Sequence, residues 1–227
     1  MTDLHTHILP GMDDGSRDVQ ESLRLVAMER EQGVTQIVLT PHYYRWREEP
    51  ESFLTRRSAA MDRLQRAVGE DAPAFRLGAE VAWFPTIVEF KDLDKLCIGD
   101  SGQFLLELPY EPWNTKLIDR LYSLTCSTGL LPILAHVERY IAIEPRQLMD
   151  ELIDLGLPMQ MNADSLLRVT RRRKCLKLLR RGRWYLASDC HSLDSRPPKL
   201  VNALKILKNK TENLEYLTNW NDASSVV

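Results

Sequence analysis

The chain has 227 residues, of which 44% are hydrophobic and 27% are charged, and this composition excludes an intrinsically disordered protein. Its length fits one large domain, and a net charge of -2 argues against a protein that binds nucleic acid along its whole face. The four cysteines form no CxxC pair, the N-terminus lacks a secretory signal, and no apolar run approaches the ~20 residues of a membrane-spanning helix. We therefore expect a reduced, cytoplasmic protein without membrane insertion.

The first amphipathic segment, from Asp18 to about Gln32, predicts a helix. Asp18 and Glu21 have the spacing of a capping box, and Gly33 stands where a C-cap belongs. Hydrophobic residues recur on one side of this segment with helical spacing. The face expected to be buried contains Val19, Leu23 and Val26.

A second helix is predicted from Pro50, a residue favourable in a first helical turn, to just before Gly69. Short runs rich in apolar and β-branched residues predict strands, which further helical stretches separate. Seven strands are expected: Thr2 to Leu4, Val34 to Thr40, Phe75 to Gly78, Phe104 to Leu106, Leu131 to Ala135, Pro158 to Met161, and Trp184 to Ala187.

Strands that alternate with helices indicate an α/β protein with a parallel sheet, and seven of them suggest a closed or nearly closed barrel. No linker or internal repeat divides the chain, so we expect a single domain over residues 1–218 and a frayed polar tail at 219–227. Parallel barrels and open parallel sheets both place their functional sites at the carboxyl ends of the strands. The residues at those ends are therefore the candidates for chemistry.

All five histidines fall at or just after the end of a short apolar run, and two other predicted strands end in the acids Glu80 and Glu107. A single histidine is usually a packed imidazole. No packing rule concentrates every histidine at strand ends, however, whereas a multi-metal centre needs imidazole and carboxylate ligands that converge there. The histidines are His5, His7, His42, His136 and His191.

Two pairs of candidate ligands have a two-residue spacing. Residues two apart in an extended segment point the same way, so His5 and His7 are expected to bind one ion together. Asp189 and His191 form the same kind of pair. Cys190 lies between them and points away, so it is expected to pack rather than to bind a metal.

Together these motifs resemble the PHP (polymerase and histidinol phosphatase) metal-dependent phosphoesterases. They are most similar to the PHP-type protein-tyrosine phosphatases of bacterial capsule and exopolysaccharide operons, and their order and spacing match over nearly the whole chain. The motifs are DLHTHILPGMDDG at 3–15, TPH at 40–42, GAE at 78–80, LELP at 106–109, AHVERY at 135–140, and ASDCH at 187–191 followed by RPP at 196–198.

The resemblance implies a distorted (β/α)7 TIM-like barrel with three divalent metal ions at the C-terminal ends of the strands. The metal of the family is usually manganese, although mixed nitrogen and oxygen ligands also accept Fe, Co or Zn. The ligands implied motif by motif are His5, His7, Asp14, His42, Glu80, Glu107, His136, Asp189 and His191.

Such a centre suits a phosphate monoester. Three divalent ions outweigh four carboxylate ligands, so the site attracts a dianion, and a metal-bound hydroxide is the expected nucleophile near neutral pH. No cysteine or serine nucleophile is therefore required. Arg139 and Arg196 follow metal ligands closely in sequence, and we expect them to bind the phosphate as catalytic residues because guanidinium matches phosphate geometry in a bidentate manner.

Two further features have more than one interpretation. The aromatic residues after the second and third strands either wall a pocket for an aromatic ring or pack in the core and rim. The segment from Arg168 to Arg183 holds nine basic residues and no acid, and is either a solvated helix face or a docking site for an acidic or phosphorylated polypeptide. The aromatic residues are Tyr43, Tyr44, Trp46, Trp83 and Phe84.

A phenol is a better leaving group than an alkyl alcohol, which permits a phosphotyrosine substrate. The resemblance implies a phosphotyrosyl protein partner, namely a bacterial tyrosine kinase of polysaccharide export, and no nucleic-acid partner. The alternatives are a PHP phosphatase of a small metabolite such as histidinol phosphate, a nuclease or polymerase-associated module, and a non-catalytic metal-binding scaffold. The oligomeric state is left open.

Overall fold

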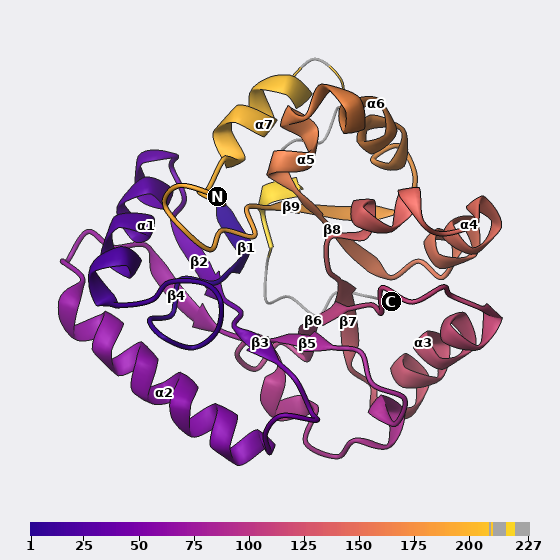
Figure 1. The fold of residues 1–227 in the computed structure, drawn as a ribbon, viewed down its shortest axis with the longest axis horizontal. Coiled ribbons are helices and arrows are strands. Elements are labelled where there is room, and N and C mark those ends of the chain that lie inside the picture. The colour runs from indigo at the N-terminus through magenta and orange to yellow at the C-terminus, as the bar shows by residue number, and fades with distance from the viewer. Residues whose placement is uncertain (209, 211–216, 221–227) are drawn as a thin grey trace.

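The computed structural model describes residues 1–208, 210 and 217–220. In this part of the chain, short parallel strands surround a central axis and helices cover their outer side (Figure 1). The strands are β1 (Thr2–Thr6), β2 (Gln36–Leu39), β3 (His42–Tyr43), β4 (Ala74–Leu77), β5 (Glu80–Ala82), β6 (Gln103–Glu107), β7 (Leu131–Leu134), β8 (Pro158–Asn162) and β9 (Arg183–Ala187).

Helices connect the successive strands except β2 with β3 and β4 with β5, and none of the described helices is long and apolar enough to cross a membrane. The α-helices are α1 (Val19–Glu31), α2 (Pro50–Ala67), α3 (Thr115–Thr128), α4 (Arg146–Asp154), α5 (Ala163–Leu167), α6 (Val169–Leu178) and α7 (Leu200–Leu207). Three short 3-10 helices are η1 (Ile87–Glu89), η2 (Asp94–Leu96) and η3 (Val137–Ala142).

The described strands occupy seven positions around the axis. They form a sheet of order β1-β2-β4 and a sheet of order β3-β5-β6-β7-β8-β9. Pro41 has no N–H for a ladder and separates β2 from β3, while Gly78 and Ala79 separate β4 from β5. We therefore count β2 with β3, and β4 with β5, as one interrupted strand of the barrel each.

The first and last strands close the barrel. The N–H of Asp189 donates to the carbonyl of His5, and the N–H of His7 donates to the carbonyl of Cys190, both at 2.9 Å. These bonds join β1 to the end of β9 in parallel orientation. The predicted seven-stranded α/β barrel is confirmed, and closure brings the two ligand pairs of the sequence side by side.

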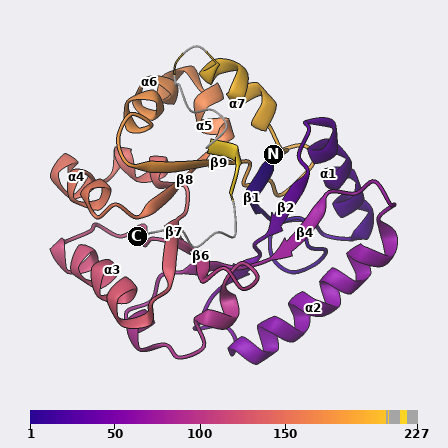
Figure 2. The ribbon, with the colours of Figure 1, turned by 180° about the vertical axis from the view of Figure 1, so that it is seen from behind.

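Trp220 fills the opposite end of the barrel. Its side chain is 2% exposed and packs with the interior residues of five strands, and its indole N–H donates to Gln103 Oε1 at 3.0 Å. Gln103 begins β6, so this contact lies at the amino end of the strands, which Figure 2 shows from behind. Trp220 falls within the segment expected to fray from Asn219 onward, and the remainder of that segment, 221–227, lies outside the described residues.

The helices α1 and α2 begin and end within a residue or two of the predicted positions. The buried face of α1 differs from the prediction, because Val19 and Leu23 are only half-buried while Leu25, Ser22 and Glu29 are buried. The hydroxyl of Ser22 donates to the carbonyl of Ile8 at 2.6 Å, and Glu29 packs beside the end of β9. Polar side chains with partners thus occupy positions that hydrophobic periodicity assigns to apolar residues.

Candidate active site

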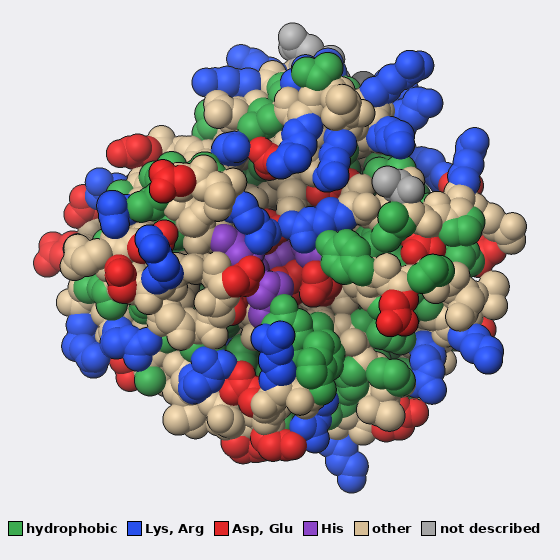
Figure 3. Space-filling view, viewed as in Figure 1, with side chains coloured by type: hydrophobic (Ala, Val, Ile, Leu, Met, Phe, Trp, Pro, Cys, Tyr) green, Lys and Arg blue, Asp and Glu red, His purple; other side chains and the backbone are tan. Residues whose placement is uncertain are grey.

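The carboxyl ends of the strands bring all nine predicted metal ligands together. Each of the nine has a ligand atom within 3.6 Å of a ligand atom of another. In the space-filling view, histidines lie at the bottom of a central depression with acidic side chains beside them (Figure 3). Barrel closure and strand register therefore produce the convergence that the positions of the histidines in the sequence predicted.

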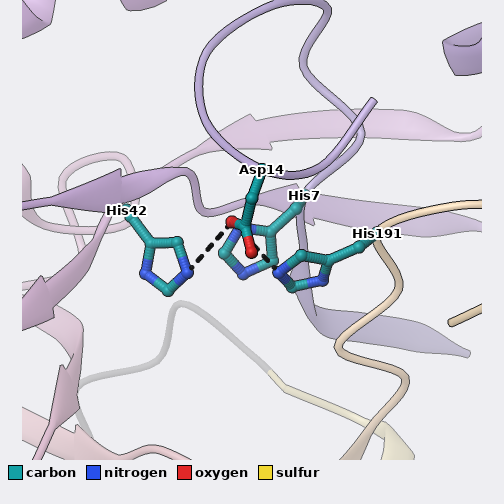
Figure 4. Close-up of side chains that lie close together, drawn as sticks. All are labelled: His7, Asp14, His42 and His191. Carbon is teal, nitrogen blue, oxygen red and sulfur yellow. Dashed lines mark ion pairs between the residues drawn. The ribbon is translucent and has the colours of Figure 1, made fainter. Parts of the chain in front are cut away.

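Within this depression, three groups of donor atoms each lie within 4.8 Å of one another. Any two of the groups have one residue in common, which is His7, His42 or Glu80. Adjoining sites of a multinuclear centre share ligands in this way. In the first group, the carboxylate of Asp14 reaches from the loop after β1 between His42 and His191 (Figure 4). The groups are His7 with Asp14, His42 and His191; His5 with His7 and Glu80; and His42 with Glu80 and Glu107.

The donor atoms fit divalent cations. Glu80 Oε2 lies 3.2 Å from the Nε2 atoms of both His5 and His7. This oxygen and His191 Nε2 are buried, and neither has a hydrogen-bond partner among the described residues. Buried polar atoms are normally satisfied, and nitrogen and carboxylate donors of this kind suit Mn, Fe, Co or Zn. Metal ions would satisfy these atoms.

Two of the predicted ligands lie outside the three groups but belong to the same cluster. His136 Nε2 is 2.8 Å from Glu80 Oε1 and 3.5 Å from Glu107 Oε1, and Asp189 Oδ1 is 3.5 Å from His5 Nε2. Their backbones adopt positive φ angles, 34° for His136 and 53° for Asp189. Residues other than glycine adopt this conformation at a cost, and such residues concentrate at functional sites.

Carboxylates determine the charge of two histidines at the centre. Burial opposes a charged imidazole, but Asp13 and Glu80 together raise the pKa of His7 to about 9. Burial likewise opposes charge on His42, and Glu80 raises its pKa to about 9. Glu80 itself is fully buried, and its histidine neighbours hold its pKa well below the usual value. Without metal ions, protons on these imidazoles balance the carboxylates.

For three other members of the cluster, neighbouring charges do not offset the effect of burial on the pKa. Burial lowers the pKa of His136 to about 4, and burial with the nearby charge of His7 lowers that of His191 to about 3. Burial and the charge of Glu80 raise the pKa of Glu107 to about 7. His136 and His191 are therefore neutral near pH 7, which is the form that ligates a metal.

Three polar side chains around the centre were not predicted. Asp13 Oδ2 lies 2.7 Å from His7 Nδ1. Gln160 Oε1 lies 3.1 Å from His5 Nδ1 and accepts from the N–H of His136 at 2.7 Å. The amide of Asn162 donates to Asp189 Oδ2 at 2.6 Å. Gln160 and Asn162 at the end of β8 have the same two-residue spacing as His5 and His7 at the end of β1. This spacing is a sequence signal that could have identified them.

The two predicted phosphate-binding arginines meet at one carboxylate oxygen. Arg139 and Arg196 both donate to Asp189 Oδ2, the latter at 2.6 Å. Asp189 Oδ1 faces the histidines instead. Asp189 thus connects a metal-donor cluster to a pair of guanidinium groups, and Tyr110 contributes a hydroxyl 3.4 Å from Arg139.

The aromatic residues divide between core and site. Tyr43 is fully buried and packs against Phe53, and Phe84 is also buried, so both belong to the core. Tyr44 stacks on the ring of His42 with 5.3 Å between the centroids, and Trp46 contacts Tyr44 and is 62% exposed. Tyr44 is therefore placed beside the candidate metal donors, with Trp46 against it.

A closed parallel barrel with imidazole and carboxylate donors at its carboxyl edge defines the class of barrel proteins whose strand ends can hold metal ions. The family described as "Capsular polysaccharide synthesis, CpsB/CapC" matches residues 1–221. The chain belongs to this family.

Curated relatives carry consistent names. The tyrosine-protein phosphatase CpsB of Streptococcus pneumoniae is 30% identical over 224 residues, which cover 92% of this chain and 90% of that protein. The tyrosine-protein phosphatase YwqE of Bacillus subtilis (strain 168) is 30% identical over 237 residues, with coverages of 96% and 91%. The putative tyrosine-protein phosphatase CapC of Staphylococcus aureus is 32% identical over 231 residues, with coverages of 96% and 89%.

Solved structures give the same result. A crystal structure from work on YwqE and CpsB, described as unique metal-dependent tyrosine phosphatases, superposes with a TM-score of 0.77 and 25% identity over 97% of this chain and 96% of that one. An organophosphorus hydrolase from Deinococcus radiodurans has a TM-score of 0.51 and 13% identity, covering 96% of this chain and 89% of its own. This second likeness concerns the fold alone.

Proposed function

We propose that this chain is a metal-dependent protein-tyrosine phosphatase whose nine converging histidines and carboxylates hold divalent ions, and whose Arg139 and Arg196 bind the substrate phosphate. The observation that carries the proposal is the position of Asp189, which contacts the histidine cluster through one oxygen and both arginines through the other. Phosphate bound by the arginines would lie directly beside the metal donors. Substrate and metal sites would therefore form one reaction centre.

We propose that the ligand set holds three ions, one at each of its three adjoining donor groups, and that the metal is manganese. Bound divalent ions would supply Lewis acidity toward the phosphoryl oxygens and lower the pKa of a water molecule at the centre. The residues of the chain position the metal ligands and the substrate. Asp13 and Gln160 orient the rings of His7 and His5. The arginines hold the phosphate and disperse its charge in the transition state.

Cysteine chemistry has no support in the structure. Cys175 and Cys190 each stand six residues before an arginine, Arg181 and Arg196, which is the spacing of the phosphate loop in cysteine-dependent phosphatases. Burial raises the pKa of Cys175 to about 12 and that of Cys190 well above its usual value. Cys175 lies within α6, and the thiol of Cys190 faces Glu29. A buried thiol with a raised pKa is a poor source of the nucleophilic thiolate.

The proposed physiological substrate is a phosphotyrosyl protein, specifically a bacterial tyrosine kinase of polysaccharide export. The family's description places its members in capsular polysaccharide synthesis, and the named relatives are tyrosine phosphatases. The ring of Tyr44 beside His42 offers an aromatic surface for the phenol. The proposed location is the cytoplasm, where ATP-dependent kinases generate phosphotyrosine.

The test is one assay of the purified protein on phosphotyrosyl, phosphoseryl and sugar-phosphate substrates. The protein is first treated with a chelator and then supplied with Mn, Fe, Co or Zn separately. We expect phosphotyrosyl peptides to be hydrolysed fastest and only after a metal is restored. A preference for a small phosphomonoester would favour the metabolite phosphatase, and inertness toward every substrate would refute the proposal.

A further inference from the structure

A cationic cavity adjoins the candidate active site on the side of α5 and α6. Its volume is about 160 Å³, and it shares Arg139, Arg196 and Asp189 with that site. Lysine and arginine side chains gather beside the histidines over this sector of the surface (Figure 3). The cavity therefore extends from Asp189 and the arginines proposed to bind phosphate toward α5 and α6.

The lining of the cavity is strongly positive. Five basic and two acidic side chains line it, which leaves a net charge of +3. Three of the cations, Arg168, Arg171 and Lys199, have no part in the phosphate site. Asp164 lies 2.7 Å from Arg168 Nε and 3.0 Å from Lys199 Nζ, so it positions both cations in the wall while neutralising only one charge.

Only part of the basic segment from Arg168 to Arg183 serves this cavity. Arg181 pairs with two aspartates of α4. Arg172 donates to the backbone carbonyls at the end of α5 at 2.8 and 3.0 Å. Arg168 and Arg171, one helical turn apart, line the cavity. The segment therefore contributes two cations to the cavity, Arg168 and Arg171, which lie in its wall with Lys199 and the two arginines of the phosphate site.

We propose that this cavity binds a second anionic side chain of the substrate polypeptide, either an acidic residue or a further phosphotyrosine close in sequence to the one being hydrolysed. This inference rests on the proposed phosphatase function. Guanidinium groups bind carboxylate and phosphate alike in bidentate geometry, and the cavity shares two arginines with the phosphate site. A side chain bound there therefore neighbours the reacting phosphotyrosine, and the enzyme selects multiply anionic peptides over neutral ones.

The experiment compares three peptides that differ only beside one phosphotyrosine, with neutral residues, glutamates or a second phosphotyrosine. It measures kcat/KM with the metal-loaded enzyme, and it measures affinity for the same peptides carrying a non-hydrolysable phosphonate in place of the phosphate. The double variant Arg168→Gln/Arg171→Gln is compared with Arg173→Gln/Lys174→Gln, which removes the same charge from exposed positions of α6 outside the cavity. A small aryl phosphate reports on the integrity of the active site.

We expect the wild type and the Arg173/Lys174 variant to prefer an anionic peptide by about 10-fold in both measurements. The Arg168/Arg171 variant should lose this preference while its turnover of the aryl phosphate stays unchanged. Whichever anionic peptide binds better identifies carboxylate or phosphate as the favoured group. The inference would be overturned if the wild type showed the same kcat/KM and affinity for all three peptides. An equal loss of preference in both variants would also overturn it. Failure of the phosphatase proposal would appear separately, as absence of any turnover.

Discussion

Asp13 Oδ2 lies 2.7 Å from Nδ1 of His7, so the opposite ring nitrogen of His7 faces the candidate metal centre. The same oxygen accepts the backbone N–H of His42 at 2.8 Å. One carboxylate thereby orients the imidazole that directly follows β1 and the start of β3. Carboxylates that hold metal-ligating histidines in this way fix the orientation of the ring and increase its basicity as a ligand.

Asp13→Asn should weaken metal binding by roughly 10- to 100-fold, because the neutral amide no longer holds His7 or increases the basicity of its ring. Isothermal titration of the chelator-treated protein with Mn²⁺ measures this change. Asp71→Asn is the matched control, since it removes the same charge from a side chain that is 80% exposed and distant from the centre. Equal affinities of the Asp13 variant and the wild type would contradict the role of Asp13.

Metal binding should release protons at neutral pH. The pKa values of His7 and His42 are raised to about 9 in the metal-free site, so both imidazoles are protonated at pH 7 and must lose a proton to bind a metal. Apparent affinity should therefore rise between pH 6 and 9. Titrations in buffers of different ionisation enthalpy count the protons, and an affinity independent of pH over this range would show that the imidazoles are already neutral.

Arg139→Ala should reduce turnover of a phosphotyrosyl peptide by roughly 10²- to 10³-fold, the usual effect of removing one donor to the transition-state oxyanion. Its metal content should not change, because the arginine contacts Asp189 through an oxygen that faces away from the histidines. Elemental analysis and kcat measured on the same preparation separate the two effects. Loss of metal from the variant would assign Arg139 a structural role.

Trp220→Ala should destabilise the protein by about 3–5 kcal/mol, since it leaves a cavity at the closed end of the barrel. Trp220→Phe retains most of the volume but loses the bond to Gln103, and should cost about 1–2 kcal/mol. Urea unfolding monitored by circular dichroism provides the free energies. Trp46→Ala serves as the control, because Trp46 is 62% exposed. A Trp220→Ala variant as stable as this control would place Trp220 outside the folded unit.

Glu138→Gln should change how stability depends on pH. Burial raises the pKa of Glu138 from 4.5 to about 7, so the folded state binds a proton that the unfolded state releases between these values. The free energy of unfolding therefore falls as pH rises from about 4.5 to 7, by on the order of 3 kcal/mol from this group. The glutamine variant should lack this decrease, and parallel pH profiles of the two proteins would refute the assignment.

The sequence by itself determined the parts of this protein that depend on local order and periodicity. Alternating strands and helices predicted the seven-position barrel, and the placement of His5, His7 and the other histidines at strand ends predicted that they would converge. This inference is robust because parallel strands bring all their carboxyl ends to one edge, whatever the details of packing. The motifs that resemble a known family then supplied the ligand set and the two arginines.

Tertiary structure alone decided which residues support that centre. Asp13 lies in the loop after β1, whereas Gln160 and Asn162 lie on β8, and each meets partners that are distant in the sequence or on another element. A polar residue in a sequence does not indicate which distant partner it will meet. Trp220, which was expected in a polar tail, is buried in the barrel interior, and Ser22 and Glu29 occupy the buried face of α1 on the outer side of the barrel. Long-range packing and hydrogen bonding override local hydrophobic patterns at these positions, because a buried polar group is stable only where the fold provides its partner.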